Sequence, residues 1–256
     1  MRQHQLTVTA LDGIPRVRPG DDLARLLVTA LEQNELAPRA QDILVVTQKI
    51  VSKAEGRYLE LATVEPSSRA REIAAITRKD VYLVEAILSQ ATAVLRVAPN
   101  VLIVATAHGL VLANAGIDQS NLEAGDHGRR VLLLPEHPDH SAQRLKERID
   151  AHFKADIGIV ISDSAGRAWR LGTTGLAIGA AGVPALLDRR GEIDMAGRPL
   201  EVTEVGFADA VAAAAVLVMG EAAEARPAAL VRGLGWSAAA RPAADLVRPK
   251  AQDLFR

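Results

Sequence analysis

An almost unbroken run of isoleucine and valine at residues 157–161 constrains the fold more than any other part of the chain. The run carries no charge, which is typical of a strand buried on both faces of a sheet. We expect the strand to end at Ser162, Asp163 and Ser164, with Gly166 then allowing the backbone to turn. The rest of the chain is therefore expected to pack around this strand.

The polar residues after this strand suggest two interpretations. Asp163 and its neighbouring hydroxyls lie beside Arg167 and Arg170. Hard cations take oxygen ligands and arginines hold phosphate oxygens, so the group suits a metal bound to phosphate. Alternatively, Asp163 caps a turn by bonding backbone amides while the arginines point to solvent. This segment alone supports the two interpretations equally.

Other segments predict a mixture of strands and helices. Buried strands are predicted at residues 43–47 and 101–105, and a helix that is apolar all round at residues 208–219. Residues 66–90 predict a helix, with a short strand near residues 81–84.

No strict βαβ alternation and no internal repeat is present. The expected fold class is therefore α+β or mixed α/β, with an irregular two-lobed architecture and not a P-loop or Rossmann fold. The glycine-rich signatures of those folds are absent from the sequence. We expect residues 1–256 to form a single domain, and residues 171–175 to form a polar glycine turn.

Composition excludes several functions. The net charge is −1 and aromatic residues make up 3% of the chain, so no nucleic-acid or membrane partner is expected. The chain has no cysteine, which excludes thiolate metal sites and thiol nucleophiles. Its longest apolar run is about half the roughly 20 residues that span a bilayer. A soluble cytoplasmic protein is expected.

Two further polar segments could carry chemistry. Lys49 and Lys53 follow the strand at residues 43–47, and their spacing could place both on one side of a helical turn. Residues 114–121 bring Asp118 together with amides and a hydroxyl around a glycine. The alternatives are a solvated charged loop for the first segment and ordinary turn chemistry for the second.

Taken together, four segments resemble the coenzyme F420-0:L-glutamate ligase family, where F420 names a deazaflavin coenzyme. They lie at residues 45–57, 113–121, 162–170 and 197–205 and occur in the family's order. The resemblance covers nearly the whole chain.

The resemblance implies an amide ligase that uses GTP and two divalent cations, Mg²⁺ or Mn²⁺. Such an enzyme joins L-glutamate to the terminal carboxylate of F420-0 through an acyl phosphate and adds further glutamates through γ-linkages. Family members are homodimers of mixed α/β fold, so a homodimer is expected here.

The resemblance also implies a set of site residues. The implied nucleotide-binding residues are Ile14, Pro15, Arg16, Val17, Gln48, Lys53 and Asn121. One metal would be held by Asp118 and Asp163, and the second by Ser164 and Glu221. Lys53 would add a point charge, and Arg167 or Arg170 a fork for phosphate or substrate carboxylate. Asp118, Asp163, Lys53 and Arg167 are the predicted catalytic residues.

Three positions depart from the family's pattern. Ser164 stands where the family commonly has threonine, and Glu221 where it frequently has glutamine. Residues 172–175 read Gly-Thr-Thr-Gly where the family often shows Gly-Gln-Thr-Asp. Two alternatives therefore accompany the ligase: a GTP-dependent ligase for another carboxylate acceptor or coenzyme precursor, and a non-catalytic nucleotide or deazaflavin binder. Actinobacterial relatives continue into a flavin-binding reductase domain where this sequence ends, so no such C-terminal domain and no FMN are expected.

Overall fold

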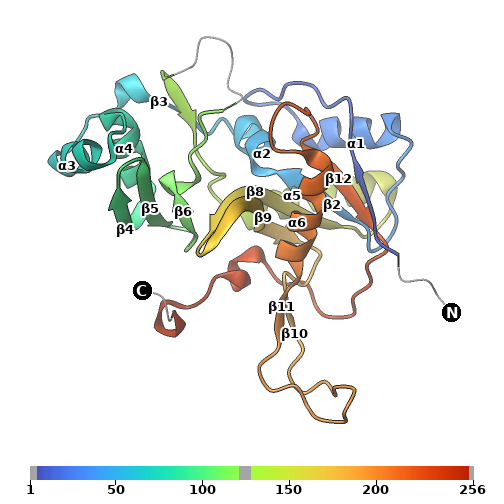
Figure 1. Cartoon of the computed structure of the whole chain (residues 1–256). Helices are drawn as coiled ribbons and strands as arrows, with labels where there is room; N and C mark the ends of the chain where they lie inside the picture. Colours follow the sequence, from blue (N-terminus) through green and yellow to red (C-terminus); the bar gives the residue numbers. More distant parts are fainter. Residues whose placement is uncertain (1–4, 121–127, 254–256) are drawn as a thin grey trace.

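A five-stranded sheet organises the larger part of the molecule (Figure 1). The computed structural model describes residues 5–120 and 128–253. The strand order is β1 (Thr7–Ala10), β12 (Ala228–Arg232), β2 (Ile43–Thr47), β8 (Gly158–Arg167) and β9 (Arg170–Ala181). Within it, β2 and β8 are the parallel pair, and both are buried along their apolar residues. The prediction that the 157–161 run forms a strand buried within the sheet is confirmed.

Helices cover both faces of this sheet. On one face α1 (Leu23–Gln33), α2 (Gln48–Ala54) and α5 (Pro138–Phe153) enclose a core with the inward residues of β2 and β8. On the other face lies α6 (Phe207–Met219). Although α6 is apolar all round, as predicted, it is buried along one side only: Leu217, on the other side, is 84% exposed.

A second group of elements has its own apolar core. It contains α3 (Ser68–Thr77), α4 (Val81–Ser89), a sheet of β4 (Ala91–Ala98), β5 (Val101–Thr106) and β6 (Val111–Ala113), and the pair β3 (Tyr58–Glu60) and β7 (Arg130–Leu132). Figure 1 shows this group beside the larger sheet, so the mixed α/β, two-lobed architecture is confirmed.

Short elements complete the described chain. Strands β10 (Leu186–Asp188) and β11 (Glu204–Gly206) form the base of an arm that projects from the body (Figure 1). The single-turn 3₁₀ helices are Leu61–Thr63, Asn114–Gly116, Ala243–Leu246 and Lys250–Gln252. Within the part of the chain that the structure describes, no helix combines the length and apolarity that crossing a bilayer requires.

Two local predictions are wrong. Residues 81–84 begin helix α4 and form no strand, because Asp80 caps the helix by accepting from the amides of Tyr82 and Leu83. Residues 171–175 form no turn but the first half of β9, paired with β8. The turn falls instead at Ala168 and Trp169, so β8 continues past Gly166.

Candidate active site

A cavity of about 670 Å³ opens at the carboxyl end of the parallel strands. Its lining joins both lobes: β2, α2 and β8 with the loop after α6 on one side, and residues 113–120 on the other. The cavity brings together these predicted site residues: Ile14, Pro15, Arg16, Val17, Gln48, Lys53, Asp118, Asp163, Ser164 and Glu221. Residues from five distant parts of the sequence thus meet at one place.

Sheet geometry explains why the cavity lies here. Thr47 at the end of β2 pairs with Ser162, and β8 then continues past β2, paired only with β9. Asp163 and Ser164 therefore lie beside the end of β2, where a strand no longer covers them. The carboxyl ends of parallel strands commonly form ligand sites for this reason.

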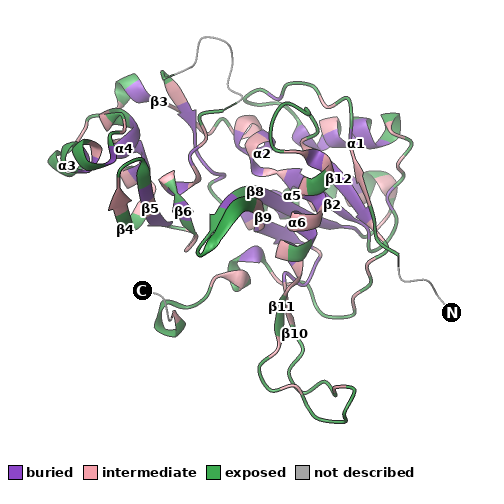
Figure 2. Cartoon of the chain, viewed as in Figure 1, coloured by how far each residue is buried: buried purple, intermediate pink, exposed green. Residues whose placement is uncertain are grey.

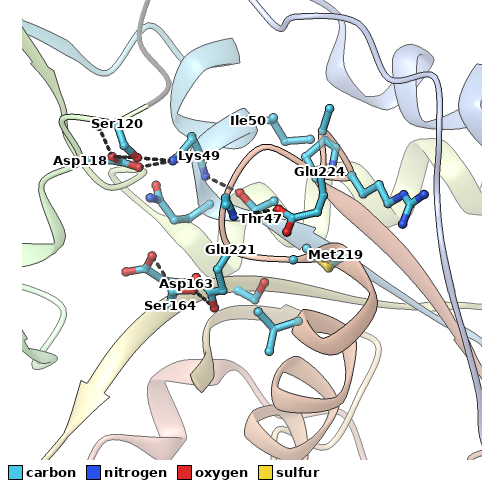
Figure 3. A pocket seen from close by; sticks show the side chains of 18 of the residues that line it. Thr47, Lys49, Ile50, Asp118, Ser120, Asp163, Ser164, Met219, Glu221 and Glu224 are labelled. Carbon is cyan, nitrogen blue, oxygen red and sulfur yellow. Dashed lines mark hydrogen bonds and ion pairs between the residues drawn. The ribbon is translucent and has the colours of Figure 1, made fainter. Parts of the chain in front are cut away.

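Helix α2 positions the basic side chains. Thr47 caps this helix, its hydroxyl accepting from the amide of Lys49 at 3.1 Å. Lys49 and Lys53 follow one helical turn apart, and both line the cavity, as their spacing predicted. Lys49 Nζ lies 2.7 Å from Asp118 Oδ2 and 2.9 Å from Ser120 Oγ (Figure 3).

Asp118 reaches the cavity from the smaller lobe. Its backbone exchanges two 2.9 Å hydrogen bonds with Leu132, which fixes its position. Its Oδ1 accepts from the amide of Ser120 at 2.6 Å and from the Ser120 hydroxyl at 2.8 Å. These bonds leave Oδ2 directed at Lys49, so the carboxylate is held by one ammonium and one serine.

Asp163 is the most perturbed acid of the site. The pKa of Asp163 is raised to about 7, mainly by burial and in smaller part by the nearby charge of Asp118. The amide of Ser164, the ammonium of Lys49 and the side chain of Gln48 act in the opposite direction. Burial, more than the charge of Asp118, therefore favours the protonated form of Asp163.

The two residues predicted to bind the second metal, Ser164 and Glu221, also lie in contact with each other. The Ser164 hydroxyl donates to the Glu221 carboxylate, with oxygen distances of 2.6 and 2.5 Å (Figure 3). Glu221 follows Gly220, which ends α6 with a φ of 78° that favours glycine. Successive strand residues point to opposite faces, so Asp163 lies towards α2 while Ser164 lies towards the loop after α6.

These donors suit a hard divalent cation. All are carboxylate or hydroxyl oxygens, and an ammonium already lies against Asp118. No three His, Asp or Glu side chains of the described residues are grouped to hold a metal. A cation here would therefore complete its shell with water and ligand oxygens, as Mg²⁺ does when it binds through one or two carboxylates and a phosphate.

Two predicted residues are not brought into the cavity. Arg167 lies at the far end of the β8–β9 hairpin and does not line the cavity, so the structure separates it from the other predicted catalytic residues. Asn121 lies outside the described residues.

Sequence reasoning also missed part of the lining. Lys49 and Ser120 lay in segments that could carry chemistry, but neither was among the predicted site residues. The loop from Gly220 to Pro227 was missed apart from Glu221. Within it Arg226 Nε donates to Asp12 at 2.8 Å, which ties the loop to the segment before Ile14. The sequence feature that could have indicated this loop is a glycine followed by acidic residues directly after a buried helix.

The Lys49–Asp118 contact makes a testable prediction about stability. Lys49→Met should destabilise the protein by about 1 kcal/mol, because it leaves Asp118 and Asp163 facing each other without their nearest ammonium. Urea denaturation measures the change. In the double variant with Asp118→Asn most of the loss should disappear, since the repulsion goes with the carboxylate. Simple additivity of the two substitutions would contradict the coupling.

A mixed α/β fold that gathers carboxylates, hydroxyls and lysines in one cavity, without a glycine-rich phosphate loop, defines a class apart from the P-loop and Rossmann proteins. The family model described as F420-0:gamma-glutamyl ligase matches residues 13–233. The chain belongs to this family.

Curated relatives agree with the family model. A coenzyme F420:L-glutamate ligase of Methanopyrus kandleri is 45% identical over 209 residues, which cover 82% of this chain and 79% of the relative. The protein of that name from Methanothermobacter thermautotrophicus is 42% identical over 219 residues, covering 86% and 85%. That from Archaeoglobus fulgidus is 42% identical over 217 residues, covering 85% and 83%.

Proposed function

We propose that this protein is a GTP-dependent ligase that joins L-glutamate to the terminal carboxylate of coenzyme F420-0. Further glutamates would be added through γ-linkages. The observation that carries the proposal is one cavity, in a chain of this family, that gathers Asp118, Asp163, Lys49 and Lys53. Relatives named as coenzyme F420:L-glutamate ligases support the acceptor and the amino acid.

The chemistry needs an activated acceptor, because a carboxylate oxygen is too poor a leaving group for an amine to displace. Transfer of the γ-phosphoryl group of GTP breaks its bond to the β-phosphate and forms an acyl phosphate, releasing GDP. The glutamate amine then attacks the acyl carbon, loses a proton and expels phosphate. Phosphoryl transfer depends mainly on positioning and charge neutralisation.

The cavity residues suit these tasks. Lys53 and Lys49 would pair with phosphate oxygens, while the segment 14–17 and Gln48 would hold the rest of the nucleotide. Asp118 and Asp163 would hold one divalent cation, and Ser164 and Glu221 a second. Bound there, Mg²⁺ or Mn²⁺ would supply charge neutralisation for the phosphate oxygens.

Mass spectrometry of a reaction with F420-0, L-glutamate, GTP and Mn²⁺ tests the proposal. The expected product is heavier by one or more glutamyl units and is absent when GTP is omitted or replaced by GDP. Bound GTP without any glutamylated product would overturn it.

A second acceptor remains a candidate because of one observation at the cavity wall. Gly175 lines the cavity beside its strand partner Ser164, at the position where the family often shows aspartate, so this position supplies no carboxylate. A ligase for a different carboxylate would show product with another acceptor in the same assay and none with F420-0.

We also propose that the protein forms a homodimer through the arm between β10 and β11. Ile193 is 65% exposed, Val202 84% and Met195 fully exposed, which is unusual for large apolar side chains on one projecting segment. Met195→Glu should shift sedimentation from dimer to monomer. The matched variant Tyr82→Glu, on α4, should remain dimeric. A monomeric wild type would contradict the proposal.

A further inference from the structure

The outer end of the β8–β9 hairpin presents large apolar and basic side chains on an exposed turn. Residues 166–173 are all exposed, as the green end of the hairpin in Figure 2 shows. Trp169 is 79% exposed and Leu171 is 100% exposed. Large apolar side chains gathered on an extended surface element mark a binding surface more often than a plain connection.

Two arginines flank the tryptophan. Arg167 and Arg170 form the last pair of the hairpin, on either side of Ala168 and Trp169. No carboxylate of the described residues forms an ion pair with either guanidinium. An aromatic face beside two uncompensated guanidinium groups complements a ligand that carries both a planar ring and an anionic group.

The hairpin is joined directly to the proposed reaction site. Strand β8 lines the cavity with Asp163 and Ser164 and continues without interruption to Arg167. At about 3.3 Å for each strand residue, Arg167 lies roughly 10 Å along the hairpin from Ser164. Trp169 lies in the turn just beyond, because the chain reverses before Arg170, the partner of Arg167. A ligand whose carboxylate enters the cavity could therefore reach the hairpin end with a group roughly 10 Å or slightly more away.

The acceptor of the proposed reaction has the three features that this surface and the cavity require: a planar ring, an anionic group and a carboxylate. A deazaflavin coenzyme carries a planar fused ring at one end, and in F420-0 a phosphodiester chain joins that ring to the carboxylate that is glutamylated. We propose that the hairpin end is the acceptor grip: Trp169 stacks on the deazaflavin ring, and Arg167 and Arg170 pair with the phosphodiester. This inference rests on the proposed function, and it makes Arg167 a substrate-binding residue with no part in the transfer of phosphate.

The test separates ring recognition from phosphate recognition in the full-length protein. Binding is followed by the fluorescence of the deazaflavin itself, without GTP, for F420-0 and for the phosphate-free deazaflavin nucleoside. Trp169→Ala should weaken the binding of both probes by about 10-fold, within the range for loss of one aromatic stack. Arg170→Ala and Arg167→Ala should weaken only the binding of F420-0.

Two matched variants serve as controls. Tyr82→Ala removes an exposed aromatic and Arg96→Ala an exposed arginine, both on the smaller lobe away from the hairpin. Neither should change the affinity of either probe. In turnover, Trp169→Ala should raise KM for the acceptor by about 10-fold while kcat at saturation and GTP affinity stay within about twofold of wild type.

Failure of this inference is distinguishable from failure of the proposed function. Wild type that glutamylates F420-0 while Trp169→Ala keeps its KM and probe affinity would overturn the acceptor grip alone. Wild type that makes no product would overturn the function. Conversion of dimer to monomer by Trp169→Ala, with probe affinity unchanged, would assign the hairpin end to contact between two copies and also overturn the grip.

Discussion

Asp163→Ala is expected to abolish glutamylation while leaving the fold intact. The carboxylate faces Asp118 across the space where the proposed cation and phosphate would lie. Loss of one such electrostatic contact costs ~10²–10³-fold in kcat, and loss of a cation ligand should cost at least that much. Measurement of GDP release and of glutamylated product, with Mn²⁺ binding followed by calorimetry, checks this result.

A control distinguishes this effect from a general loss of charge. Asp188→Ala removes an exposed carboxylate at the base of the arm, and it should leave turnover unchanged. Near-wild-type product formation by Asp163→Ala would eliminate Asp163 as a metal ligand.

The same residue gives a dependence of stability on pH. The pKa of Asp163 is raised from 3.8 to about 7 in the folded protein, so the folded state keeps a proton that the unfolded chain has already released. Stability is therefore lost as the pH rises through this window. In EDTA, Asp163→Asn should be more stable than wild type above about pH 7, and the difference should shrink towards pH 4. Chemical denaturation at several pH values measures it, and parallel curves would contradict the assignment.

Gly175→Ala is the second substitution with a large expected effect. A Cβ at this position would lie 2.3 Å from the carbonyl oxygen of Ala212, so α6 would have to move away from β9. Overpacking of this kind costs ~1–3 kcal/mol. At roughly 2–4 °C for each kcal/mol in a chain of this size, the Tm should fall by several degrees. Because α6 ends next to Glu221, we also expect slower product formation.

Gly166→Ala on the same hairpin is the matched control. Nothing lies within 4 Å of a Cβ built there, and its φ is not in the left-handed region. Its Tm should stay close to that of wild type. Equal Tm values for the two variants would show that α6 adjusts without strain.

The predictable parts of the fold were those whose local pattern and tertiary role agree. The 157–161 run and residues 43–47 form buried interior strands because an uncharged β-branched run has few other stable environments. The spacing of Lys49 and Lys53 predicted a shared helical side, and α2 supplies it.

The other parts depend on partners that are distant in sequence. Residues 171–175 are rich in glycine and threonine, and only pairing with β8 makes them a strand. Strand β4 lacks alternating burial, so its sequence offered no period to detect. The contact between Lys49 and Asp118 joins two lobes, and no local pattern in either segment indicates it. Arg167 was predicted close to Asp163 because the turn was placed too early.

Asp163 and Ser164 are neighbours in sequence, yet β8 directs one towards α2 and the other towards the loop after α6. The face of the sheet on which each side chain lies therefore depends on its position in the strand. Insertion or deletion of an odd number of residues between the buried run and Asp163 would move Asp163 to the face that Ser164 now occupies. Only insertions of an even number of residues should be tolerated there. Beyond Ala165, the last core residue before the hairpin end, this constraint no longer applies. The hairpin can therefore change length without altering the faces on which Asp163 and Ser164 lie.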